Sequence, residues 1–254
     1  MTASLVRRPA TVDIYDAFCG GGGVSEGWRR AAERLGIPVR IVGLDNDPAR
    51  LEEYPFEGIL VDDAVPWIEE HGGKFDIGLG SPTCTGYSRG TAALPDRLTR
   101  YDRLIPATRE AMRLHGKPYV IENVADARPE LENPVMLCGR MFGLTAVDDD
   151  GTVLTLDRHR LFEIHGPAVM IPEHVPHGWK SNQRDGIQVA GVYGGARRDK
   201  VEARTIRKGG YVPPNLEVLR ALLDTPWMGE RSCFHAIPPA YAEHIAMQIL
   251  PHLG

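Results

Sequence analysis

Residues 12–28 have the sequence VDIYDAFCGGGGVSEGW, which gives the clearest indication of the fold. Its first part is short and rich in β-branched and aromatic residues, which is typical of a strand. Residues 23–35 carry helix-compatible spacing, and four consecutive glycines, Gly20 to Gly23, join the two segments. Glycine after the first strand of an open α/β sheet lets a ligand approach the backbone closely. The stretch therefore predicts a strand, a turn and a helix, with the turn serving either as a ligand site or as a tight structural connection.

The same alternation continues through the first half of the chain. We expect strands at 12–18, 39–44, 57–61, 75–80 and 118–122, and helices at 23–35, 48–54, 64–71 and 100–115. Strands that alternate with helices predict an α/β fold with a doubly wound, mostly parallel sheet and helices on both of its faces.

The amino-acid composition changes after about residue 165, where Pro, Gly, His and Arg become frequent. Helical stretches follow at 215–223 and 239–250. This change predicts a small lobe between two parts of one larger unit. The expected division is a main domain at 1–165, a small lobe at 166–212, and C-terminal helices at 213–254 that return to the main domain.

Composition limits the classes of protein. With 254 residues, of which 43% are hydrophobic, the chain can bury a sizeable core. No apolar run of about 18 residues and no signal-peptide pattern occurs, so we expect a protein in the cytoplasm of a bacterial or phage-infected cell, without membrane contact. We also expect a monomer. A net charge of -5 means that nucleic acid would have to be bound by a local patch. The four cysteines form no C-x-x-C pair and are expected to be free thiols.

Three acidic residues accompany the glycine turn. Asp16 precedes it, Asp45 ends the second expected strand, and Asp63 follows the third. Carboxylates at these strand ends suit a ligand with hydroxyl groups, an exocyclic amine and a positive centre better than they suit a pyrophosphate. S-adenosylmethionine has those features, and we expect it as the cofactor.

A second candidate site follows the fourth strand. Cys84 lies in the loop GSPTCTGYSRG, residues 80–90, where a thiol would be exposed to the cleft at the carboxyl end of the sheet. Glu122 ends the fifth strand, and Arg158 and Arg160 alternate in RHRLF. A thiol, a carboxyl and two guanidinium groups would then meet in one cleft, although each alone is also compatible with packing or a surface ion pair.

These motifs, in this order, resemble the DNA cytosine-5 methyltransferases. DAFCGGGG matches the family's cofactor motif at Asp16, Phe18, Gly20, Gly22 and Gly23. The family's catalytic-loop, E-N-V and R-x-R motifs match at Cys84, Ser88, Glu122, Asn123, Val124, Arg158 and Arg160, and LRALLDTPWM and AIPPAYAEHIAMQIL are similar to its last two motifs.

The resemblance implies a fold of the S-adenosylmethionine-dependent methyltransferase type and covalent catalysis. Cys84 would attack C6 of cytosine so that C5 can accept a methyl group, Glu122 would bond N3 and the exocyclic amine, and Arg158 and Arg160 would lower the thiol pKa and orient the base. The target base would have to be flipped out of the duplex. In the cofactor site, Phe18 would stack on adenine, Asp45 would hold the ribose and Asp63 the adenine amine.

Some positions depart from the family pattern. Thr83 replaces a proline, Thr85 and Leu156 replace glutamines, and His235 stands near the position of an asparagine beside the methionine part of the cofactor. A histidine there could bond an additional carboxylate, so transfer of a group other than methyl, from a carboxylated cofactor, is an alternative.

The expected partner is double-stranded DNA. ARRDKVEARTIRK, residues 196–208, holds six basic and two acidic residues in an otherwise acidic protein. The candidate DNA contacts are Ser88, Arg197, Arg198, Lys200, Arg204, Arg207 and Lys208. His174 and His177 form H-x-x-H, but no third firm ligand is evident from the sequence, and we expect no metal.

Other functions remain as alternatives. The same chemistry could act on RNA, or the chain could be a DNA-binding regulator without catalysis. A nicotinamide oxidoreductase would explain the glycines but would leave Cys84, Glu122 and the arginines without a shared purpose. The compact form suits a phage or a mobile element, with or without a restriction nuclease as partner.

Overall fold

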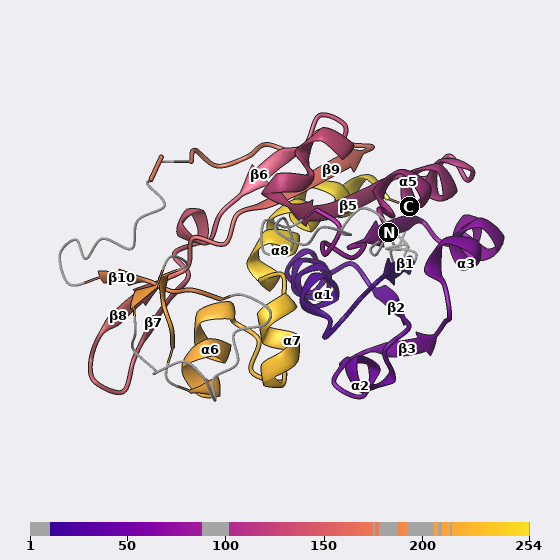
Figure 1. The fold of residues 1–254 in the computed structure, drawn as a ribbon. Coiled ribbons are helices and arrows are strands. Elements are labelled where there is room, and N and C mark those ends of the chain that lie inside the picture. Colours follow the sequence, from indigo (N-terminus) through magenta and orange to yellow (C-terminus); the bar gives the residue numbers. More distant parts are fainter. Residues whose placement is uncertain are drawn as a thin grey trace, which may run out of the picture.

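A computed structural model of the chain describes residues 11–87, 102–174, 176–177, 187–192, 206–207, 210–213 and 215–253. Its main element is a seven-stranded sheet in the order β3 (Glu57–Leu60), β2 (Val39–Asp45), β1 (Val12–Ala17), β4 (Ile77–Gly80), β5 (Tyr119–Val124), β9 (Arg160–His165) and β6 (Val135–Leu137) (Figure 1). The pairs from β3 to β5 are parallel, and β9 runs antiparallel to both of its neighbours. The prediction of a doubly wound, mostly parallel sheet is confirmed.

Helices cover both faces of this sheet. One face packs against α1 (Gly23–Leu35) and α8 (Pro239–Ile249), and the other against α3 (Ala64–His71) and α5 (Ile105–Arg113). Neighbouring strand residues point to opposite faces, since Ile14 belongs to the first core and Tyr15 to the second. Strands buried on both sides read as continuous apolar runs, which is why the sequence predicts them well.

The predicted helices are present with shifted ends. Helix α2 (Pro48–Leu51) stops earlier than expected, and Pro55 accounts only for the loss of helical geometry at Tyr54, the residue before it. Helix α5 starts only at Ile105, with Pro106 in its first turn, where a missing N–H costs nothing. Helices α6 (Leu216–Leu223) and α8 lie close to their predicted ranges.

A second, smaller core lies beside the main sheet, at the left of Figure 1. A three-stranded sheet joins β7 (Thr145–Val147), β8 (Val153–Thr155) and β10 (Ile187–Val189), and α6 and α7 (Glu230–His235) pack against it. A two-stranded ladder, β11 (Ile206–Arg207) with β12 (Gly210–Tyr211), adds Tyr211 to this core.

The second core differs from the predicted lobe at 166–212. It draws Leu154 from before that range and Leu219 and Cys233 from after it, so its boundaries are not those of one continuous segment. Of the C-terminal helices, α8 packs on the main sheet, whereas α6 and α7 join the second core. Side chains from three separate stretches complete this core, and periodicity within any one of them does not reveal the others.

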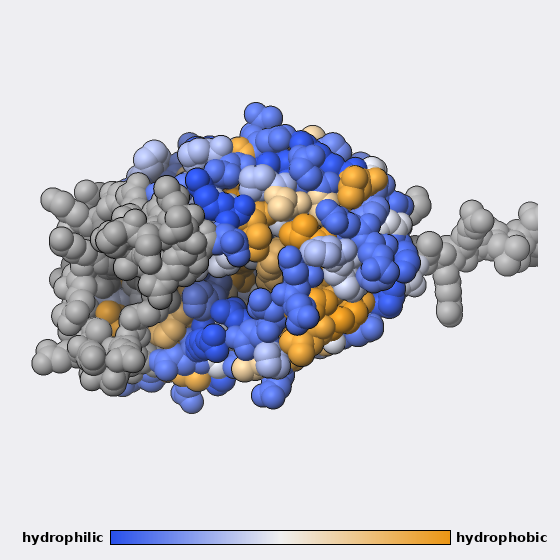
Figure 2. Space-filling view, turned by 45° about the vertical axis from the view of Figure 1, so that its right-hand side comes forward, coloured by the Kyte–Doolittle hydropathy of each residue, from blue (hydrophilic) through white to orange (hydrophobic). Residues whose placement is uncertain are grey.

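The surface is mainly hydrophilic on the face that Figure 2 shows, with hydrophobic residues gathered in smaller patches. Within the described ranges, no helix combines the length and the apolar character that crossing a membrane requires.

Candidate active site

The glycine turn connects β1 to α1 through left-handed backbone. Phe18, Gly20 and Gly22 have φ values of 60°, 53° and 85°. The amide of Gly20 donates to Oδ2 of Asp45, 2.9 Å away at the end of β2. The Asp45 carboxylate therefore holds the turn in place, and it faces the region where the predicted ligand would bind.

Two glycines of the turn are required by neighbouring protein atoms. A Cβ at Gly23 would lie 2.1 Å from the carbonyl oxygen of Ile237, and a Cβ at Gly22 would lie 2.9 Å from the ring of Tyr54. The C-terminal segment before α8 thus packs directly on the start of α1. This close packing explains part of the glycine run without a ligand.

A cavity of about 180 Å³ lies beside the turn. Phe18, Asp45, Asp62 and Asp63 contribute to its wall. Oδ1 of Asp63 accepts a hydrogen bond from the amide of Val65 at 2.9 Å and so caps α3, while the residue stays exposed. An aromatic ring with carboxylates around it is a suitable receptor for an adenosine group.

Asp16 does not belong to the wall of this cavity. It is fully buried, Oδ2 accepts a hydrogen bond from Ser25 Oγ at 2.6 Å, and Oδ1 has no hydrogen-bond partner among the described residues. Burial, helped by the charges of Asp45 and Glu122, raises the pKa of Asp16 to about 7, although the hydrogen bond from Ser25 acts in the opposite direction. The residue therefore couples the cofactor side of the site to Glu122.

The predicted nucleophile lies in residues 81–87, which hydrogen bonds hold in place. Nδ2 of Asn123 donates to the carbonyl oxygen of Pro82 at 2.8 Å, and the amide of Tyr87 donates to that of Cys84 at 3.0 Å. Cys84 is partly exposed, as a reacting thiol must be. Burial raises the pKa of the Cys84 thiol, and the charge of Arg160 opposes this effect.

Glu122 and Arg160 form an ion pair at the carboxyl end of β5. Arg160 Nε lies 3.0 Å from Glu122 Oε1, but the contact lacks hydrogen-bond geometry. Burial raises the pKa of Glu122 to about 7, although both Arg160 and Arg158 act in the opposite direction. A proton is therefore available on this carboxyl group near neutral pH.

Arg158 connects two backbone segments that are distant in the sequence. It donates from Nη1 to the carbonyl oxygen of Val192 at 2.7 Å and from Nη2 to that of Phe234 at 2.9 Å. Burial, with the charge of Arg160, lowers the pKa of Arg158 to about 9, and the charges of Cys84 and Glu122 raise it slightly. The structure thus brings all four predicted catalytic residues into electrostatic contact, with Arg158 also linking the second core to the site.

His235 lies at the end of α7, near several arginines. Desolvation by the surrounding protein, followed by the charges of Arg50 and Arg158, lowers the pKa of His235 to about 4. The ring is neutral at physiological pH and still exposed.

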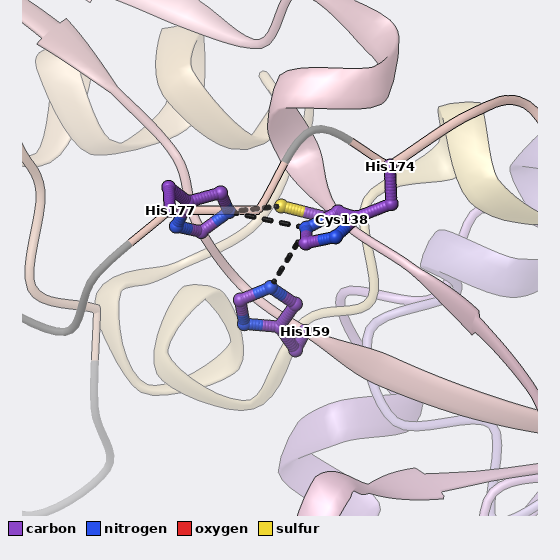
Figure 3. A group of neighbouring side chains, drawn as sticks. All are labelled: Cys138, His159, His174 and His177. Atoms are coloured by element: carbon purple, nitrogen blue, oxygen red, sulfur yellow. Dashed lines mark hydrogen bonds between the residues drawn. The ribbon is translucent and has the colours of Figure 1, made fainter.

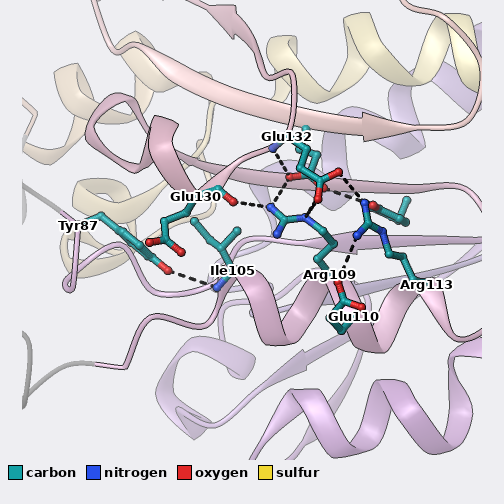
Figure 4. A network of polar contacts seen from close by, with 9 residues as sticks. Tyr87, Ile105, Arg109, Glu110, Arg113, Glu130 and Glu132 are labelled. Carbon is teal, nitrogen blue, oxygen red and sulfur yellow. Dashed lines mark hydrogen bonds and ion pairs between the residues drawn. The ribbon is translucent and has the colours of Figure 1, made fainter.

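A buried ion pair that the sequence did not reveal ties α5 to β9 (Figure 4). Arg109 Nη2 lies 2.6 Å from Glu163 Oε2, and the two side chains are only 7% and 3% exposed. Tyr87 Oη accepts from the amide of Ile105 at 3.3 Å, so the loop of Cys84 is anchored to the same helix. These contacts hold β9, and with it Arg160, in a defined position.

The predicted DNA contacts lie largely outside the described residues. This applies to Ser88, Arg197, Arg198, Lys200, Arg204 and Lys208. Only the backbone of Arg207 is described, in β11.

Comparisons with known proteins give the same architecture. The Dnmt2 methyltransferase of S. pombe matches with a TM-score of 0.60 and 11% identity over 96% of this chain and 99% of the other. The chain has a methyltransferase fold. The methyltransferase EhMeth of Entamoeba histolytica matches with a TM-score of 0.55 and 10% identity over 96% and 99% of the two chains. No family model and no curated protein matches the sequence.

This methyltransferase fold puts the glycine turn and the Cys84 loop on one edge of the sheet, because both follow parallel strands at their carboxyl ends. Sequence reasoning missed Asn123 as the anchor of the nucleophile loop, although the residue was part of the matched E-N-V motif. It also missed a group formed by Cys138, His159, His174 and His177, whose members come from separate segments.

Proposed function

We propose that the protein transfers a methyl group from S-adenosylmethionine to C5 of a cytosine in DNA, through a transient bond between Cys84 and C6. The observation that carries this proposal is the buried ion pair of Glu122 and Arg160, with the charges of both acting on the Cys84 thiol and on Arg158. A thiol, a carboxyl group near its pKa and two guanidinium groups are the set that addition to a pyrimidine requires.

The residues present fit the cofactor. The cavity beside Phe18 has an aromatic wall and carboxylates from Asp45 and Asp63 for the adenosine group. Oδ1 of Asp16 is buried without a hydrogen-bond partner among the described residues, which leaves an acceptor near the turn. When bound, S-adenosylmethionine would supply the methyl group that C5 takes up.

The protein's own groups account for the protons. The Cys84 thiol first loses its proton to water, and the thiolate then forms the S–C6 bond while the Glu122 carboxyl group donates its proton to N3, so the added ring is neutral and C5 becomes nucleophilic. After C5 has been alkylated, its proton leaves to water, the S–C6 bond breaks, and N3 returns its proton to Glu122. Because the pKa of Glu122 is about 7, both directions of this transfer are accessible near neutral pH.

DNA is the proposed substrate because of the basic segment 196–208 and the family resemblance of the motifs. RNA would meet the same chemical groups, so it is the competing substrate. A carboxylated cofactor is a second alternative, favoured by the cationic surroundings of His235, which include Arg50 and Arg231.

A mechanism-based trap tests the proposal. The protein is incubated with S-adenosylmethionine and with DNA or RNA oligonucleotides that contain 5-fluorocytosine, whose C5 fluorine cannot leave as a proton does. We expect a stable adduct on Cys84 with DNA, detected by mass spectrometry, and its mass reports the transferred group. Cys84→Ser should form no adduct, whereas Cys233→Ser, which alters a buried cysteine in α7, should form it normally.

The other outcomes are distinct. An adduct with RNA alone would replace the DNA assignment. Binding of either nucleic acid without any adduct would contradict catalysis and would favour a regulatory role.

A further inference from the structure

Four potential metal ligands converge on one point beside β9 (Figure 3). Cys138 follows β6, His159 directly precedes β9, and His174 and His177 come from the chain after β9. One ligand atom from each residue lies within 4.8 Å of all the others. Three segments that are separate in the sequence thus present three imidazoles and one thiol to a common centre.

Three of the separations between ligand atoms are close to those of a tetrahedral site. Nε2 of His174 lies 3.2 Å from Nε2 of His159 and 3.2 Å from Nε2 of His177, and Sγ of Cys138 lies 3.3 Å from Nε2 of His177. Ligands at about 2.0–2.1 Å (nitrogen) and about 2.3 Å (sulfur) from a tetrahedral zinc ion are separated from each other by about 3.3–3.6 Å.

Hydrogen bonds alone do not satisfy this arrangement. An imidazole nitrogen has a single position in the plane of its ring, occupied either by a proton or by a lone pair. Nε2 of His174 faces two other ring nitrogens at the same distance, so at most one of the two contacts is a good hydrogen bond. A cation at the centre would accept all of these lone pairs at once.

A carboxylate supports one of the ligands from behind its ring. Nδ1 of His177 lies 3.0 Å from Oδ2 of Asp157, and Asp157 is itself paired with Arg140. A carboxylate on the far nitrogen of a histidine fixes the ring and directs the other nitrogen toward a metal. This contact is independent of the convergence of the four ligand atoms.

We propose that Cys138, His159, His174 and His177 bind a structural Zn²⁺ ion. Three imidazoles and one thiolate complete a tetrahedral shell, which is the arrangement of a structural zinc site, and the thiolate favours zinc over oxygen-seeking cations. The ion would clamp the chain at 174–177 to the segment that carries Arg158 and Arg160. The proposal does not depend on the transferred group or on the nucleic acid.

Cobalt substitution tests it in the full-length protein. The metal-free protein is titrated with Co²⁺ and then with Zn²⁺. We expect intense visible bands typical of tetrahedral Co²⁺, a near-ultraviolet thiolate-to-cobalt band, and loss of both on addition of one equivalent of Zn²⁺ per chain. This measurement needs no variant, so it is informative even if a variant fails to fold.

Variants identify the ligands. Cys138→Ser should lose the thiolate-to-cobalt band, whereas the control Cys233→Ser should keep it. Asp157→Asn should weaken zinc binding by about 10–100-fold while the spectrum of the cobalt form is retained. Chelation should lower the melting temperature of the wild type and of Cys233→Ser.

Two results would overturn the proposal. One is a wild-type protein that purifies without zinc and shows no tetrahedral cobalt spectrum. The other is a thiolate-to-cobalt band that persists in Cys138→Ser.

Discussion

Nε of Arg160 lies 3.0 Å from Oε1 of Glu122, across the antiparallel pair β5 and β9. In the register of this pair Arg160 is opposite Val124, so Glu122 is its diagonal neighbour on the same face. The pair is buried, and desolvation outweighs the attraction: the pKa of Glu122 rises to about 7 despite two nearby guanidinium groups. Burial, more than the pairing with Arg160, thus sets the protonation state of the group that we assign to proton transfer.

The first prediction concerns stability and pH. A carboxyl group whose pKa is higher in the folded than in the unfolded state makes the folded state less stable as pH rises between the two values. For Glu122 this window runs from its ordinary 4.5 to about 7. Between pH 4.5 and pH 8, Glu122→Gln should therefore gain about 3 kcal/mol in unfolding free energy relative to the wild type.

Urea denaturation at both pH values measures this difference. Asp16 titrates in both proteins, and the Glu122 charge has the smallest of the effects on its pKa, so most of its contribution cancels. Glu69→Gln, at an exposed position of α3, is the control. Equal pH dependence in wild type and Glu122→Gln would show that the carboxyl group is not desolvated.

The same substitution tests catalysis. Glu122→Gln keeps the size of the side chain and removes the proton that N3 requires, so we expect turnover to fall by about 10²–10⁴-fold. Transfer of the labelled methyl group to DNA measures this rate. If the rate is unchanged while the stability shift is present, Glu122 has no role in proton transfer.

Gly23 is required by packing. In Gly23→Ala the new methyl group would meet the carbonyl oxygen of Ile237, which belongs to the backbone and cannot turn away. We expect a loss of about 3 kcal/mol in unfolding free energy, at the upper end of overpacking costs. Gly21→Ala is the control, because its methyl group would meet the side chains of Met228 and Ser232 at 3.1–3.2 Å. Equal unfolding midpoints for both variants would contradict this explanation.

The two roles of Asp63, capping α3 and binding the cofactor, can be measured separately. Asn is as good an N-cap as Asp, so Asp63→Asn should keep α3 capped through Val65 and leave the melting temperature nearly unchanged. An amide side chain loses one acceptor, so we expect weaker binding of S-adenosylhomocysteine, by about 10-fold, which corresponds to one hydrogen bond to a charged group. Calorimetry measures the affinity, and unchanged binding would exclude Asp63 from the cofactor site.

The Arg109–Glu163 pair should be costly to break. Glu163→Gln leaves the buried Arg109 with only the more distant and exposed carboxylate of Glu132, and we expect a loss of about 3–5 kcal/mol in unfolding free energy. Glu110→Gln, which removes an exposed partner of Arg113 on the same helix, should cost at most about 1 kcal/mol. Similar costs for the two changes, measured by urea denaturation, would show that burial does not strengthen this pair.

Much of the main domain follows from the sequence alone. The strands from Val12 to Val124 are recognisable because a sheet covered on both faces needs continuous apolar runs. The turn at Gly20–Gly23 is recognisable because backbone conformation depends mainly on the residues of the turn themselves. The order of motifs also indicates Cys84 and Glu122 as partners, since Cys84 follows β4 and Glu122 lies near the carboxyl end of the parallel strand β5.

The contacts between segments that are distant in the sequence are evident only from the tertiary structure. The second core unites β7 and β8 with α6 and α7, and the group around Cys138 and His174 joins three segments, although nothing local in any segment indicates the others. Likewise, the pKa of Glu122 depends on desolvation by side chains that are distant in the sequence. Backbone propensity acts over a few residues, whereas burial, charge and ligand geometry depend on distances that exist only once the chain has folded.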